Sequence, residues 1–188
     1  MKRYITAIMV SVAVLASAGV QAAGAERVLT YVGDDPMVGY TTRRSETIDL
    51  AMRVSNPYLA GMKVTGMKVK VNSGNQDLSG CSLWLSEALT LEKNESGKKV
   101  NVADVVSVAA TPDDEGWMSV TFEQPYTLTA KGVYAGYSFT IDAYDDSKGQ
   151  PIAYSQTRHD GGFYFHGSKS AVKWVDYEDR LKGVLPIY

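Results

Sequence analysis

A regular alternation of apolar and polar residues over positions 133–141 constrains the fold of this chain more than any other feature. The apolar set is Val133, Ala135, Tyr137, Phe139 and Ile141, and the residues between them are Tyr134, Gly136, Ser138 and Thr140. Successive side chains of a β-strand point to opposite faces, so a period of two predicts a strand with one buried face. We expect the five apolar side chains to face the core.

The same period of two recurs over residues 48–54 and 118–122. Shorter strand candidates cover residues 27–32, 83–87, 100–108, 152–155, 163–166 and 172–174. Turn-forming sequences rich in Gly, Pro, Asn and Asp separate them, at residues 33–36, 72–75, 94–97, 111–116 and 145–149. Only residues 57–62 are suited to a short helical turn. Many short strands with frequent turns predict an all-β fold, a two-layer antiparallel β-sandwich or barrel, of which we favour the sandwich.

The alternation changes phase within residues 62–71. Met62 and Val64 share one parity, whereas Met67, Val69 and Val71 share the other. A slip of one residue would turn every later side chain to the wrong face unless a bulge or bend absorbs it. We therefore expect an irregularity at Gly66.

The N-terminus has the pattern of a secretory signal peptide. Lys2 and Arg3 precede an apolar run over residues 4–20, and small residues follow it. The run is short for a membrane span and has no basic flank after it. We predict cleavage after Ala22 or Ala25, so that residues 1–25 form the signal peptide and residues 26–188 form a single exported domain. We expect a periplasmic, cell-surface or extracellular location, with no membrane insertion after cleavage.

The last five residues, 184–188, form an apolar, strand-like segment with the sequence VLPIY. Pro186 favours an edge strand, because proline cannot donate a hydrogen bond to a neighbouring strand. A β-domain normally carries its last strand to a polar end. We therefore expect that the chain stops inside its final strand, as a fragment or truncated product would.

Charge and cysteine content exclude several classes of partner. The formal net charge is −2, and removal of Lys2 and Arg3 makes it −4. A mildly acidic domain argues against nucleic acid and against anionic membrane surfaces, both of which favour a basic face. Cys81 is the single cysteine, so an intramolecular disulfide is impossible. We expect it to be a buried apolar side chain without chemistry of its own.

Several short motifs follow one another in a familiar order along the chain. They are VGY (38–40), YLAGMKVTGM (58–67), LWLSE (83–87), GW (116–117), PYTL (125–128), VYAGY (133–137) and WVD (174–176). In this order the chain resembles a family of secreted, jelly-roll-like β-sandwich domains of gut and oral Gram-negative anaerobes. Such domains follow the signal peptide in larger surface proteins, including adhesins and putative peptidases. The resemblance implies export and a β-sandwich; it implies no catalytic residue.

No catalytic or metal-binding pattern stands out. His159 and His166 lie seven positions apart and lack the spacing typical of zinc ligands. The chain has no G-x-S-x-G motif, and no histidine is paired with Cys81 in the sequence. Asp142, Asp145 and Asp146 are calcium candidates, but their spacing differs from that of a calcium loop, and a solvated turn is favoured. We expect no cofactor.

The aromatic residues give the remaining indication of function. Exposed Tyr and Trp side chains can stack on sugars or form the centre of a protein interface. Trp174 and Tyr164 are the first ligand-binding candidates, and Trp84 is a third. We predict an exported, non-enzymatic binding or adhesion module that recognises a glycan or a surface protein. An accessory domain of a secreted hydrolase or peptidase, and a structural spacer of a surface assembly, are the alternatives.

Overall fold

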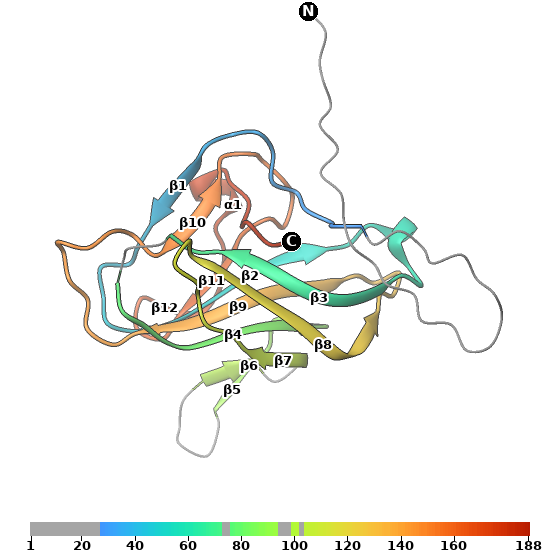
Figure 1. Cartoon of the computed structure of the whole chain (residues 1–188), viewed down its shortest axis with the longest axis horizontal. Helices are drawn as coiled ribbons and strands as arrows, with labels where there is room; N and C mark the ends of the chain where they lie inside the picture. Colours follow the sequence, from blue (N-terminus) through green and yellow to red (C-terminus); the bar gives the residue numbers. More distant parts are fainter. Residues whose placement is uncertain (1–26, 73–75, 94–98, 102–103) are drawn as a thin grey trace, which may run out of the picture.

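The alternating segments of the sequence form two packed antiparallel layers, so the fold is all-β (Figure 1). The structure is a computed structural model, and it describes residues 27–72, 76–93, 99–101 and 104–188. The predicted signal peptide lies outside the described residues. No helix in the described part of the chain is long and apolar enough to cross a membrane.

The first layer is a six-stranded sheet in the order β12-β11-β2-β9-β4-β7. Its strands are β2 (Thr47–Val54), β4 (Leu78–Ser86), β7 (Asp104–Ala109), β9 (Val133–Ile141), β11 (Tyr164–Gly167) and β12 (Ala171–Asp176). The second layer contains the pair β1 (Met37–Tyr40) and β10 (Ile152–Ser155) and the pair β3 (Lys63–Lys70) and β8 (Trp117–Thr127). A hairpin of β5 (Leu91–Lys93) and β6 (Lys99–Asn101), the 3-10 turn η1 (Pro57–Leu59) and the helix α1 (Glu178–Leu181) complete the elements.

The predicted face of β9 is confirmed. All five apolar side chains of its alternating set are buried in the core, where Tyr137, Phe139 and Ile141 are fully inaccessible. The β2 strand pairs with β9 over its whole length and contributes its own alternating set, including Ile48 and Leu50. Since a slip of one residue would expose both sets together, burial of these side chains fixes the register.

The irregularity predicted near Gly66 is also present. The additional residues that break the regular pairing belong to the partner strand, β8. Val64 lies opposite Tyr126 and Gly66 lies opposite Thr121, so one β3 residue faces residues 122–125 of β8. A Cβ atom on Gly66 would lie 2.3 Å from the Val120 carbonyl oxygen, which explains why glycine occupies this close approach. The long bulge bends β8 at this point.

Residues 184–188 join the two strand pairs of the second layer. Val184 exchanges two backbone hydrogen bonds of 2.9 Å with Ser155 of β10, and Tyr188 exchanges two of 2.7 Å with Lys68 of β3. Pro186 contributes only its carbonyl oxygen, which accepts from Lys70 at 3.1 Å. Residues 184–188 form isolated bridges and not a regular strand, and Pro186 cannot donate the reciprocal hydrogen bond to Lys70.

The strand bounds differ from the sequence prediction at several points, and the single strand expected over residues 100–108 is replaced by β6 and β7, which belong to different sheets. Residues 27–32 form no strand, although Leu29, Tyr31 and Val32 pack against the core. Strands β1 and β5, of four and three residues, were not predicted. The helical turn expected within residues 57–62 is present as η1.

Candidate functional site

The outer face of the six-stranded sheet carries a shallow hollow lined by aromatic and charged side chains. We call it the aromatic cleft; its volume is about 580 Å³. It is lined by Arg53, Glu87, Ala88, Leu89, Lys131, Gly132, Val133, Tyr134, Tyr164, Trp174 and Asp176. These residues come from strands and turns that are far apart in the sequence, and sheet pairing brings them together.

Strand pairing positions the central residues of the cleft. Arg53 of β2 lies directly opposite Tyr134 of β9, and Tyr164 of β11 lies opposite Asp176 of β12. The rings of Tyr134 and Tyr164 meet edge to face, with centroids 5.5 Å apart and an interplanar angle of 79°. This arrangement is favourable for aromatic pairs and holds both rings on a rigid sheet.

The charged side chains of the cleft are available to a ligand. Arg53 is exposed and forms no ion pair within 4 Å among the described residues. Burial and the nearby carboxylate of Asp176 raise the pKa of Tyr164, while Arg53 opposes the increase. The Tyr164 hydroxyl therefore stays protonated at neutral pH and is able to donate a hydrogen bond.

A buried polar network lies next to the cleft, beneath Trp174. The Trp84 indole N–H donates to the Ser138 hydroxyl at 2.9 Å, and that hydroxyl donates to Asp49 at 2.6 Å. The second carboxylate oxygen of Asp49 lies 2.7 Å from Nδ1 of His166, whose side chain is 1 % exposed. Nε2 of His166 and Nε1 of Trp174 are buried without a hydrogen-bond partner. Of these two residues, Trp174 also lines the cleft.

This network does not have the order of a serine-hydrolase triad. In such a triad the serine hydroxyl bonds to histidine, and the histidine bonds to the carboxylate. Here Asp49 lies between Ser138 and His166, so the serine proton is directed to the carboxylate and not to the imidazole. The arrangement stabilises the sheet face and holds the His166 ring against Trp174, at a centroid distance of 5.7 Å.

Two of the three predicted ligand-binding residues lie together in the aromatic cleft, and the third, Trp84, does not line it. Trp174 and Tyr164 both line the aromatic cleft. The outward parity of Trp84 is correct, but its expected exposure is wrong, because the side chain is only 2 % exposed. Its ring packs against Gly136 and meets Trp174 edge to face at a centroid distance of 6.1 Å.

Sequence reasoning missed Arg53 as a candidate for this site, and it noted Tyr134 without choosing it. Both occupy outward positions in the two most regular alternating segments. That parity identifies the exposed face of each strand, but it gives no indication that β2 and β9 are neighbours. Glu87 and Lys131 lie in turns beyond β4 and before β9, where no periodicity could select them.

The metal candidates do not gather into a site. No group of three or more His, Cys, Asp or Glu side chains in the described part of the chain is arranged to hold a metal ion. Asp145 accepts hydrogen bonds from the backbone and hydroxyl of Ser147, which lower its pKa, so it belongs to a solvated turn with the exposed Asp142 and Asp146. His159 stacks on Tyr31 at 3.6 Å, whereas His166 bonds to Asp49.

Cys81 is half-buried on β4 and packs against the core, so the expectation of full burial is only partly met. Its thiol lies 3.9 Å from the Ser79 carbonyl oxygen, a weak contact. Burial raises the pKa of Cys81. A raised pKa lowers the fraction of reactive thiolate at neutral pH, which argues against a nucleophilic role.

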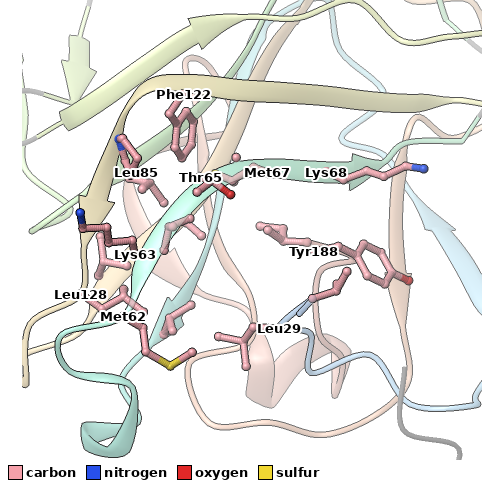
Figure 2. Close-up of a pocket in the computed structure, with 18 of the residues that line it drawn as sticks. Leu29, Met62, Lys63, Thr65, Met67, Lys68, Leu85, Phe122, Leu128 and Tyr188 are labelled. Carbon is pink, nitrogen blue, oxygen red and sulfur yellow. The ribbon is translucent and has the colours of Figure 1, made fainter. Parts of the chain in front are cut away.

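A second, larger hollow lies between the two layers (Figure 2). We call it the interlayer cavity; its volume is about 940 Å³. Its walls are mostly apolar and include Met52 and Val54 of β2, Leu85 of β4 and Ala135 of β9. The bulge of β8 and residues 62–68 close it on the side of the second layer.

Comparisons with known proteins leave the geometry as the basis for assigning a function. A scan against protein-family models, a search of curated proteins and a search of solved structures find no match to this chain.

Proposed function

We propose that this protein is an exported, non-enzymatic binding module that recognises a glycan through the aromatic cleft. The observation that supports this proposal most directly is the conjunction of Tyr134, Tyr164 and Trp174 with Arg53 and Asp176 in one hollow. A sugar ring has an apolar face that stacks on aromatic rings and a rim of hydroxyl groups that bond to charged side chains. The cleft offers both kinds of group side by side.

The rigidity of the site favours recognition as well. The central residues belong to the paired strands β9, β2, β11 and β12 rather than to free loops. A preorganised surface loses little conformational entropy when it binds, so a modest hollow can bind with useful affinity. The order of the buried network, in which the serine bonds to the carboxylate, argues for binding rather than hydrolysis.

A glycan array of the exported protein is the first test, followed by calorimetry with the glycan that binds. We expect Tyr164→Ala to weaken binding roughly 30-fold, the effect of losing about 2 kcal/mol at a central contact. Arg53→Met should also weaken binding without lowering the melting temperature, because Arg53 is exposed and forms no ion pair with another described residue. Tyr58→Ala is the matched control, since Tyr58 is 93 % exposed and lies outside the cleft.

Trp174 requires a separate design because it also covers the buried network of His166 and Asp49. Trp174→Phe keeps an aromatic cover, whereas Trp174→Ala removes it. The proposal is contradicted if no glycan binds, or if bound glycan is insensitive to both Tyr164→Ala and Arg53→Met. A large loss of stability in Tyr164→Ala, with binding unchanged in Arg53→Met, would show that the aromatic residues serve packing alone.

A further inference from the structure

The interlayer cavity is an apolar space inside the sandwich that the side chains of this protein leave unfilled. The floor is the inner face of the six-stranded sheet, at Leu85 and Ala135, and the opposite wall is formed by β3 and the bulged part of β8. In the view of Figure 2, Met62, Lys63 and Leu128 lie at one end, and Lys68 and Tyr188 lie at the other. Nothing in the fold of the described residues occupies the volume between them.

The size of the cavity distinguishes it from a packing defect. Protein interiors are packed as densely as organic crystals, and their few voids are small. A volume of about 940 Å³ falls instead in the range of sites for small molecules, about 300–1,000 Å³. An apolar cavity does not bind water well, so its walls gain contact and dispersion energy only from an apolar occupant.

The sequence builds this space with specific residues rather than by chance looseness. The register between β3 and β8 jumps at Gly66, so that residues 122–125 of β8 face Thr65 alone. The bulge carries β8 away from its regular path, and Phe122, Glu123 and Pro125 of the bulge line the cavity. Pro125 has no N–H group to pair with β3, which favours the irregular backbone at this point.

The charged residues at the cavity indicate what kind of polar group a bound apolar molecule would carry. Arg27, Lys63 and Lys68 line it, with Glu123 as the carboxylate among them. Lys68 is already engaged, because its ammonium lies 4.2 Å from the ring centroid of Trp117. Arg27 and Lys63 form no ion pair within 4 Å among the described residues, so the lining has two unpaired cations.

We propose that the interlayer cavity binds a single-chain amphiphile with an anionic head group, of which a long-chain fatty acid is the simplest. The alkyl chain lies between the two layers, against Leu85 and Ala135, and the carboxylate lies toward Lys63 and Arg27. Apolar walls with a cationic margin complement both parts of such a molecule. The site is separate from the aromatic cleft, which lies on the opposite face of the six-stranded sheet.

The test is equilibrium binding of fatty acids to the exported protein after removal of bound lipid, below their micellar concentrations. We expect saturable binding of hexadecanoate at one molecule per protein. Affinity should rise about fourfold for each methylene group from octanoate upward and then level off when the cavity is full. Hexadecanol, which has the same chain and no charge, should bind more weakly.

Matched variants separate the tail site from the head-group site. Ala135→Leu adds three carbons inside the cavity and should weaken hexadecanoate binding at least tenfold, whereas Ala143→Leu, at an exposed position outside it, should not. Lys63→Met should weaken hexadecanoate by about two- to fivefold and leave hexadecanol unchanged, since the ion pair is partly exposed. Lys173→Met on β12 is its control, because Lys173 is exposed and does not line the cavity.

Three results would overturn the proposal. One is the absence of saturable binding to folded protein, and another is an affinity that does not change with chain length. The third is a stable dimer in solution that protects Met62 and Leu128 from hydrogen exchange without added lipid, because a second copy would then be the occupant. The chain-length series does not depend on any variant, so it decides the question even if Ala135→Leu fails to fold.

Discussion

Gly136→Ala should be among the most destabilising single-methyl additions in this protein. Gly136 lies in the middle of β9, with the indole ring of Trp84 directly over it. A Cβ atom at this position would lie 2.3 Å from two ring atoms of Trp84 and 2.6 Å from the Leu50 carbonyl oxygen. Both distances are too short for carbon, so either the ring or the strand has to move.

The size of the effect follows from what can move. Overpacking a dense region costs about 1–3 kcal/mol. The Trp84 ring can shift, but its N–H would leave the Ser138 hydroxyl at 2.9 Å, and the Leu50 oxygen belongs to the fully paired backbone of β2. We therefore expect a loss of about 3 kcal/mol, which corresponds to a decrease of roughly 6–12 °C in the melting temperature of a domain of this size.

Thermal and urea unfolding of the variant measure this loss, and a double-mutant cycle with Trp84→Leu identifies its cause. Because the smaller Leu side chain relieves part of the contact, the double variant should be more stable than the sum of the single effects by about 1 kcal/mol. A change of less than 2 °C in Gly136→Ala would refute the reasoning. Strict additivity in the cycle would show that Trp84 does not lie over Gly136.

Three further changes test other parts of the structure. Glu46 is 3 % exposed, and although burial opposes its ionisation, the Thr42 hydroxyl and the N–H groups of Lys169 and Ser170 favour the carboxylate and lower its pKa. It therefore stabilises the fold at pH values above its ordinary pKa of 4.5 and less as the pH falls through the lowered value. Glu46→Gln should cost about 1–3 kcal/mol at pH 7 and flatten the acid limb of a plot of unfolding free energy against pH; an unchanged limb would contradict this account. Leu185→Ala removes a fully buried side chain and should cost about 2–5 kcal/mol in urea unfolding, with a loss under 1 kcal/mol as the contrary result. Native Cys81 should react with a thiol reagent at least about tenfold more slowly than the unfolded chain, and Cys81→Ser should cost no more than about 1 kcal/mol; equal labelling rates would show an accessible thiol.

Local periodicity predicted the parts of the fold in which one face of a strand is buried. The alternation over residues 133–141 identified the inner face of β9 because each inward side chain meets the core and each outward one meets a neighbour on the sheet surface. The phase change before Met67 likewise indicated a bulge, since continuous pairing would have exposed Val69. In both cases the alternation of apolar residues within a single strand was sufficient to make the prediction.

The candidate sites depend on pairings between distant strands, which no local pattern contains. Trp84 has the correct outward parity, yet it is buried because Gly136 of a neighbouring strand leaves room for its ring. Arg53 and Tyr134 meet only because β2 and β9 are adjacent, an order that the chain does not show in its sequence. The interlayer cavity is lined by a register jump in which four residues of β8 face one residue of β3. Neither strand alone shows this jump in its sequence.

The position of residues 184–188 between β10 and β3 has a consequence for how this domain folds. The segment follows every named strand in the sequence, yet it forms backbone bridges to both the β1-β10 pair and the β3-β8 pair, from Val184 to Ser155 and from Ile187 to Val69. Contacts with such long sequence separation form slowly, because a large loop must close first. The bridges that residues 184–188 make between the two pairs of the second layer can therefore form only after the whole described domain has been made, and until then the inner face of the first layer is less completely covered and more prone to aggregation. Late completion of the sandwich therefore lengthens the time for which the newly made chain stays incompletely folded.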